Sequence, residues 1–321
     1  RKDLARVQLS CGASTPRPQQ MASTVREALR WTAPSALTMG ALLSGLTAVR
    51  YASEEEFSMS VNCVMLAAIL DGLDGHVARY LNSCSKLGFE LDSLCDLANF
   101  GVSPSLIAYF WAKALPASEC NSEHCQVEHF TLWVSCCAYS ACCAFRLARF
   151  NVAGHAAQMD AQHLEAKPGS RPPVPMAVMH NFRQRKLYFQ GVPAPVGAAY
   201  ALTPLMLRFS RMPPLIGFVG EAGAWAIGRR GTAVTLFITA FLMVSPLPTF
   251  SSKMLKTDRD DTHLRSRHAA SGVAKVAMGV LFCSVCWYFP FEILLLLNLG
   301  HLASIPVAVA AFSMLAEEKH D

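Results

Sequence analysis

Four aspartates lie close together in the sequence, between two strongly apolar segments. Asp71 and Asp74 are three positions apart in the stretch DGLDGHVAR, and Asp92 and Asp96 are four apart in GFELDSLCD, which follows after eight residues. If both stretches are helical, each pair shares a face and can direct its oxygens to one point. Hard oxygen ligands that converge in this way suit Mg²⁺ or Mn²⁺. The spacing therefore predicts a site for divalent metal.

The composition of the chain makes these acids unusual. Hydrophobic residues form 52% of the 321 residues and charged residues only 16%, and the mean hydropathy is +0.29. Ordinary soluble domains are far less apolar, so the sequence predicts a protein that crosses the membrane several times. A charge within a spanning helix costs roughly 2.5 kcal/mol or more and marks an ion or substrate site. We therefore expect the acids to face a cation or a water-filled cavity.

The apolar runs predict an all-α, polytopic membrane helix bundle of about eight transmembrane helices. A helix needs about 20 residues to cross a bilayer. Runs near this length lie at 33–51, 57–75, 94–114, 129–148, 192–209, 231–250, 272–289 and 291–314. Pro290 separates the last two runs, and the weaker segment 212–228 predicts a re-entrant or interfacial helix.

The charges in the predicted loops predict the orientation of the helices. Acidic residues follow the first span at 54–56 and the third span at Glu119, Glu123 and Glu128, whereas Lys and Arg gather in the alternate loops. Because Lys- and Arg-rich loops stay on the cytoplasmic side, the aspartates are predicted at the cytosolic ends of the second and third helices. Four residues depart from this pattern: Arg208, Arg211, Arg229 and Arg230.

The net charge of +5 is spread over several loops. Basic loops beside a membrane are attracted to anionic lipids by about 1 kcal/mol for each nearby Lys or Arg. We therefore expect the lipid bilayer, and no nucleic acid, as the partner of these charges.

Three regions are expected along the chain. Residues 1–30 are basic and form a disordered or processed N-terminal tail, either a cytosolic tail or the remnant of a transit peptide. Residues 31–255 form the membrane domain, with a solvent-exposed insertion at about 153–187 that is rich in His, Pro and Arg. Residues 256–321 form a cytosolic loop followed by two additional transmembrane helices.

The aspartates belong to a longer pattern of fixed positions. The pattern reads DxxDGxxAR, eight residues, and GxxxDxxxD, and the chain fills every fixed position, with Gly75, Ala78, Arg79 and Gly88 between the acids. This pattern resembles that of the CDP-alcohol phosphotransferase family, integral membrane enzymes that transfer a phosphoalcohol from a CDP-linked donor to a hydroxyl and release CMP. The resemblance implies a catalytic core of six transmembrane helices within the bundle.

The resemblance also implies a role for each motif residue. Asp71, Asp74, Asp92 and Asp96 would hold metal, expected to be two Mg²⁺ or Mn²⁺ ions, and Asp96 would be the general base that takes the proton of the acceptor hydroxyl. The CDP donor would be bound by Gly75, Ala78, Arg79, Ser85 and Gly88. Ser85 and Ala78 are also small enough to serve only helix packing.

Segments outside the motif are similar to one branch of the family. The runs LDSLCDLANFGVSPSLIAY, RLARFNV at 146–152, FQGVPAPVGAA at 189–199 and MVSPLPTFSSK at 243–253 resemble phosphatidylserine synthases of the CDP-diacylglycerol type. The resemblance implies CDP-diacylglycerol as donor, L-serine as acceptor and CMP as product. Arg146 and Arg149 would contact the acceptor or a phosphate, or else anchor the helix end at the interface. Asn151 is expected to be structural.

Other readings of the sequence remain open at this point. The same chemistry could act on inositol or glycerol 3-phosphate, and membrane carboxylates alone would also suit an ion transporter. The first span has Ser35 and Ala41 where relatives usually have asparagine, so donor contacts from that helix are not defined. The resemblance implies a homodimer, and the loop charges predict a site that faces the cytosol. The compartment stays open between the endoplasmic reticulum or another endomembrane and a bacterial inner membrane.

Overall fold

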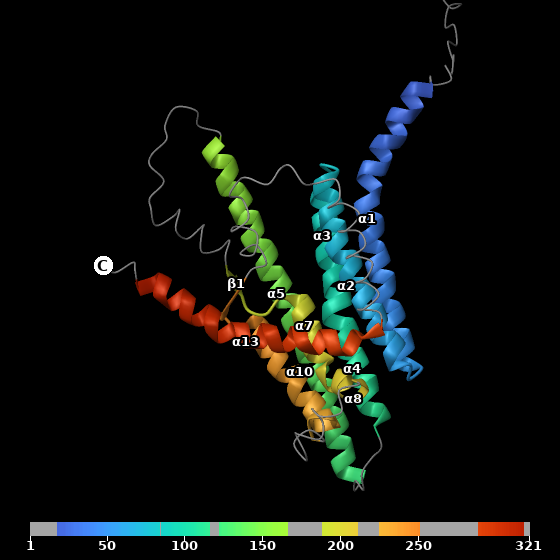
Figure 1. The fold of residues 1–321 in the computed structure, drawn as a ribbon, viewed down its shortest axis with the longest axis vertical. Helices are drawn as coiled ribbons and strands as arrows, with labels where there is room; N and C mark the ends of the chain where they lie inside the picture. The colour runs from blue at the N-terminus through green and yellow to red at the C-terminus, as the bar shows by residue number, and fades with distance from the viewer. Residues whose placement is uncertain are drawn as a thin grey trace, which may run out of the picture.

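The computed structural model describes residues 18–83, 85–115, 122–165, 188–210, 225–250 and 288–317. Almost all of these residues are helical, and the long helices α1 to α5 and α10 run side by side (Figure 1). The prediction of an all-α membrane helix bundle is confirmed. Four helical segments of the described part are long and apolar enough to cross a membrane, at Thr32–Ser53, Phe57–Tyr80, Gln126–Val152 and Pro290–Ser313.

Helices α1 (Pro18–Ser53) and α2 (Phe57–Tyr80) form an antiparallel hairpin. The turn between them uses Glu55 with a positive φ of 63°. Small buried residues such as Ala41 and Ala48 allow the two helices to approach closely, and the Ser60 hydroxyl donates to the Ala48 carbonyl over 2.8 Å. Helix α1 begins at Pro18, so residues 18–30, which we expected in the N-terminal tail, are helical.

The second long helical segment carries the second half of the motif. It consists of α3 (Lys86–Asp96), the π-helix η1 (Leu97–Val102) and α4 (Ser103–Ala114), which follow one another without a break. The predicted span at 94–114 covers only its later part. Since the helix begins at Lys86, the motif from Gly88 to Asp96 lies within regular helix, as its spacing required.

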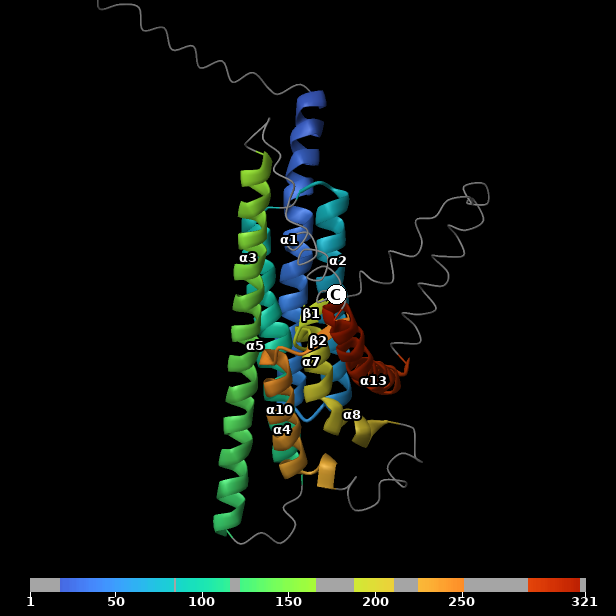
Figure 2. The ribbon, with the colours of Figure 1, turned by 90° about the vertical axis from the view of Figure 1, so that its left-hand side faces the viewer.

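Helix α5 (Ser122–Glu165) has 44 residues, and at 1.5 Å per residue it is about 66 Å long. This is about twice the thickness of the hydrocarbon layer, and Figure 2 shows α5 extending along the whole bundle. The predicted span at 129–148 lies in its middle. Residues 153–165, where we expected an exposed insertion, continue the same helix, whereas residues 166–187 lie outside the described residues.

A short ribbon and three helices follow. Strands β1 (Tyr188–Gln190) and β2 (Pro248–Phe250) pair antiparallel, with α7 (Ala194–Ala201), α8 (Thr203–Phe209) and α10 (Arg229–Val244) between them in sequence. The span predicted at 192–209 is divided into α7 and α8. The division falls just before Pro204, which has no N–H to continue the helical hydrogen bonds.

Helix α13 (Pro290–Glu317) begins at the proline that was predicted to separate the last two apolar runs. It crosses the direction of the other helices at a large angle (Figure 1). Polar contacts fix it at the α7–α8 division, where the Asn298 amide donates to the Ala199 carbonyl and to the Thr203 hydroxyl, both over 3.0 Å. The predicted span at 272–289 and most of the predicted re-entrant segment lie outside the described residues.

Candidate active site

Helix α2 supplies the first two acids and α1 supports one of them. Asp71 and Asp74 lie one turn apart on α2, so they share a face. The hydroxyl of Thr38, on α1, donates to Asp74 Oδ2 over 2.5 Å, and both side chains are buried. Thr38 was not among the predicted site residues. A single hydroxyl in an apolar span gives no sequence signal, because such residues also bond within their own helix.

Helix α3 brings the second pair of acids to the first. Oxygens of Asp71, Asp74 and Asp92 all lie within 4.8 Å of one another. The carboxyl groups of Asp71 and Asp96 are within hydrogen-bonding reach of each other. Three of the four aspartates, Asp71, Asp74 and Asp92, therefore gather at one place between α2 and α3, and the fourth, Asp96, lies one turn after Asp92 on α3. Like charges this close repel one another unless positive charge lies between them.

The oxygens of this cluster fit a divalent metal ion. Asp71 Oδ1 and Asp96 Oδ1 are buried, and no hydrogen-bond donor of the described residues reaches either atom. An unpaired acceptor in an apolar region is costly, and a cation satisfies several such oxygens at once. Carboxylate oxygens are the ligands that Mg²⁺ and Mn²⁺ prefer. The donor set of the four aspartates thus suits either ion.

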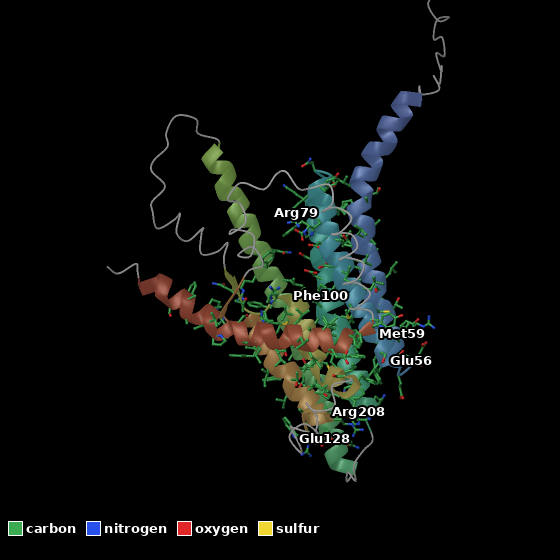
Figure 3. The ribbon with its side chains drawn as sticks, in the orientation of Figure 1. Glu56, Met59, Arg79, Phe100, Glu128 and Arg208 are labelled. Atoms are coloured by element: carbon green, nitrogen blue, oxygen red, sulfur yellow. The ribbon has the colours of Figure 1, made fainter. Side chains whose placement is uncertain are left out.

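The predicted donor-binding residues on α2 lie beside open space. A Cβ added to Gly75 would have no neighbour within 4 Å. Ala78 is half-buried, and Arg79 is exposed near the end of α2 opposite to Glu56 and Met59 (Figure 3). Glycine within a helix costs roughly 0.5–1 kcal/mol relative to alanine, and protein packing does not require it here. The open space at Gly75 leaves room for a group that approaches from outside the chain, and the same is true of Gly72 one turn earlier on α2.

Ser85 and Gly88 have a local structural function. Ser85 is the N-cap of α3, and its hydroxyl accepts the Gly88 N–H over 3.0 Å. Ser and Thr caps of this kind typically contribute about 1 kcal/mol. A Cβ at Gly88 would lie 3.1 Å from the Ser85 hydroxyl oxygen, so the absent side chain keeps the cap in place. Both residues help to start the helix that carries Asp92 and Asp96.

The two predicted arginines of α5 differ in their surroundings. Arg146 interacts electrostatically with Asp96, and its buried Nε has no hydrogen-bond partner among the described residues. Arg149 instead donates to the carbonyls of Val244, over 3.1 Å, and Gln190, over 3.2 Å. Arg146 therefore interacts electrostatically with Asp96, whereas Arg149 connects α5 with the β1 strand and the end of α10.

Asn151 is also engaged in structure. Its Nδ2 donates to the Ser93 hydroxyl over 2.9 Å, and Ser93 follows Asp92 directly on α3. This contact joins α5 to the acid-bearing helix. The sequence-based expectation of a structural role for Asn151 agrees with this geometry.

Comparisons with known proteins give the same family as the motif. A model of the CDP-alcohol phosphatidyltransferase family matches residues 31–227. A protein of Mycobacterium tuberculosis (strain H37Rv), named CDP-diacylglycerol–serine O-phosphatidyltransferase, is 30% identical over 292 residues, which cover 88% of this chain and 80% of that protein. Two proteins with the same name match shorter parts of the chain. The protein of Helicobacter pylori strain 26695 is 49% identical over 78 residues, which cover 24% of this chain and 33% of that protein. The protein of Bacillus subtilis is 34% identical over 120 residues, which cover 37% of this chain and 60% of that protein.

Proposed function

The chain belongs to the CDP-alcohol phosphatidyltransferase family, and from this premise we propose that it transfers the phosphatidyl group of CDP-diacylglycerol to L-serine, with release of CMP. The observation that carries the proposal is the convergence of the motif aspartates, with oxygens of Asp71, Asp74 and Asp92 within 4.8 Å of one another. Relatives named as serine phosphatidyltransferases support the choice of donor and acceptor.

The four aspartates are the proposed ligands of divalent metal. When bound, Mg²⁺ or Mn²⁺ supplies positive charge that stabilises the oxygens of the diphosphate as its bond breaks. Thr38 holds Asp74 in one orientation through its hydrogen bond. A carboxylate fixed in this way loses little freedom when the metal binds, which favours binding.

Asp96 is the proposed general base. The serine hydroxyl oxygen forms a bond to the phosphorus that carries diacylglycerol, the bond from that phosphorus to the CMP oxygen breaks, and the hydroxyl proton passes to Asp96. A carboxylate has two oxygens, so one oxygen of Asp96 can contact metal while the other accepts the proton. A covalent phosphatidyl–carboxylate step is the second mechanism; exchange of labelled CMP into donor without serine would favour it.

Arg146 is the proposed contact for the serine carboxylate. Its guanidinium interacts electrostatically with Asp96, and a serine carboxylate bound by it would place the serine hydroxyl on the side of the proposed base. A guanidinium offers two parallel donors to a carboxylate. On the donor side, the exposed Arg79 and the open space at Gly75 are the proposed contacts of the CDP group.

We propose that the site faces the cytosol. Arg79 and Lys86 flank the end of α2 and the start of α3, near the acids, whereas Glu54, Glu55 and Glu56 lie at the other end of α2. Lys and Arg gather on the cytoplasmic side of membrane proteins, so the basic end of α2 is the proposed cytosolic end.

Two of the arginines that departed from the pattern have structural partners. Arg230 pairs with Glu128 over 2.7 Å, and Arg229 donates to the carbonyls of Ala112 and Leu115. Their contacts explain their position at the opposite end of the bundle.

The decisive experiment is CMP release from CDP-diacylglycerol with a panel of acceptors. Purified protein with Mn²⁺ or Mg²⁺ should release CMP with L-serine and only weakly with inositol or glycerol 3-phosphate. Asp96→Asn should remove turnover but retain donor binding, and Asp71→Asn should weaken metal binding. No CMP release with any acceptor would refute the activity, and preference for another acceptor would correct the substrate. Molar mass in detergent tests the expected homodimer.

A further inference from the structure

The π-helix η1 begins directly after the proposed base. Its residues are Leu97–Val102, and Asp96 is its N-cap. A π-helix has i→i+5 hydrogen bonds and commonly occurs at functional sites. Because this turn is wider than an α-helical turn, side chains before it point in a different direction about the helix axis, relative to those after it, than they would in a continuous α-helix. The direction of Asp96, at the end of α3, relative to α4 therefore depends on whether this short segment keeps its π geometry.

Helix α5 holds η1 by hydrogen bonds to its backbone. The Tyr139 hydroxyl donates to the Phe100 carbonyl over 2.7 Å, and the Ser140 hydroxyl donates to the Gly101 carbonyl over 3.2 Å. Tyr139 is fully buried and Phe100 nearly so; Figure 3 labels Phe100 in the middle of the bundle. A Cβ at Gly101 would lie 3.1 Å from Cys143 Sγ, so α5 packs directly on η1.

Helix α1 holds η1 from a second direction. A Cβ at Gly45 would overlap the Asn99 amide oxygen, so Asn99 fills the space left by the glycine. The Ser103 hydroxyl donates to the Gly45 carbonyl over 3.2 Å. Gly45 lies seven residues, or about two turns, after Thr38, which bonds Asp74. The same face of α1 thus contacts the acid cluster and η1.

We propose that Tyr139 is a positioning residue for the acid cluster: its hydroxyl holds η1 in the π geometry that directs Asp96 toward Asp71. Tyr139 itself touches neither carboxylate through any hydrogen bond of the described residues. It acts through the Phe100 carbonyl, four residues after Asp96. The inference rests on the proposed function, because it assumes that the cluster binds metal.

The test compares Tyr139→Phe with a matched control, Ser60→Ala. Both substitutions remove one buried hydroxyl that donates to a carbonyl of another helical segment, over 2.7 Å and 2.8 Å, but Ser60 lies at the end of α2 remote from the acids. Mn²⁺ binding to purified protein is measured by electron paramagnetic resonance, without substrates. Hydrogen exchange of residues 97–102 and the melting temperature are measured in metal-free protein.

Tyr139→Phe should weaken Mn²⁺ binding by about tenfold, which corresponds to about 1.4 kcal/mol, the order expected when a buried carbonyl loses its donor. Exchange in 97–102 should become faster. Both substitutions should lower the melting temperature to a similar extent, but Ser60→Ala should leave Mn²⁺ affinity unchanged. If Tyr139→Phe does not fold, Ser140→Ala, which removes the longer bond to Gly101, should still weaken Mn²⁺ binding by about threefold.

The outcomes separate this inference from the proposed function. Wild-type protein that releases CMP, together with a Tyr139→Phe variant of unchanged Mn²⁺ affinity, would overturn the positioning role and leave the function standing. Equal losses of Mn²⁺ affinity in Tyr139→Phe and Ser60→Ala would also overturn it, because both would then act through general stability. Wild-type protein that neither binds Mn²⁺ nor releases CMP would overturn the function and the inference together.

Discussion

Gly75→Ala should make the protein more stable and its donor binding weaker. The substitution places a methyl group where no atom of the described residues lies within 4 Å, so it creates no clash within the chain. Replacing a helical glycine by alanine stabilises by roughly 0.5–1 kcal/mol. A methyl group forced into a close contact with ligand costs about 1–3 kcal/mol. The substitution therefore stabilises the free protein and weakens the complex with donor.

The assay measures both effects on the same preparations. The apparent melting temperature should rise by about 1–3 °C, and the KM for CDP-diacylglycerol should rise by about tenfold. Gly300→Ala is the matched control, since a Cβ at Gly300, within α13, also has no neighbour within 4 Å. It should raise stability alone. An unchanged donor KM for Gly75→Ala would refute the assignment of the open space at Gly75 to the CDP group.

Two further predictions concern side chains around the acids. Thr38→Val keeps the shape of the residue but removes the hydrogen bond to Asp74. Because hydrogen bonds to charged groups contribute about 1.5–3 kcal/mol, Mn²⁺ affinity should fall by at least about tenfold. Unchanged affinity in a metal titration would show that Thr38 does not hold Asp74 for metal binding. Arg146→Met should raise the KM for serine selectively, whereas Arg149→Met, which loses two bonds to backbone carbonyls, should lower the melting temperature without a selective effect on serine. The reverse pattern in kinetics and melting curves would exchange the two roles.

Features of the site that depend on residues close together in the sequence could be predicted from the sequence. Asp71 and Asp74, and Asp92 and Asp96, have helical spacing, so each pair was expected on one face, and the structure brings Asp71, Asp74 and Asp92 together between α2 and α3. The apolar runs located most helices because membrane spans have a simple length requirement. These features depend on intervals of three to about twenty residues, which a single sequence displays directly.

Other features depend on contacts between distant positions or on small backbone differences. Thr38 and Asp74 are 36 residues apart, and Arg149 and Val244 are 95 apart, so nothing local marks either pair. The π-helix covers only six residues, too few for the hydrophobic pattern to separate its period from that of an α-helix. The contacts of Arg149 and Arg146 differ only in the folded chain, although both are arginines one turn apart on α5.

Unpaired polar atoms give a view of the site that is independent of the motif. In the described residues, eight buried side-chain nitrogen and oxygen atoms have no hydrogen-bond partner, and five of them belong to Asp71, Asp96, Asn99 and Arg146. At the end of α2 remote from the acids, the buried hydroxyl of Ser60 donates to a carbonyl. Because an unpaired polar atom is most costly in an apolar region, such atoms persist where something other than the chain pairs with them. The unpaired atoms of Asp71, Asp96 and Arg146 are therefore consistent with the ligand site that the aspartate spacing predicts, whereas the unpaired amide of Asn99 lies against Gly45.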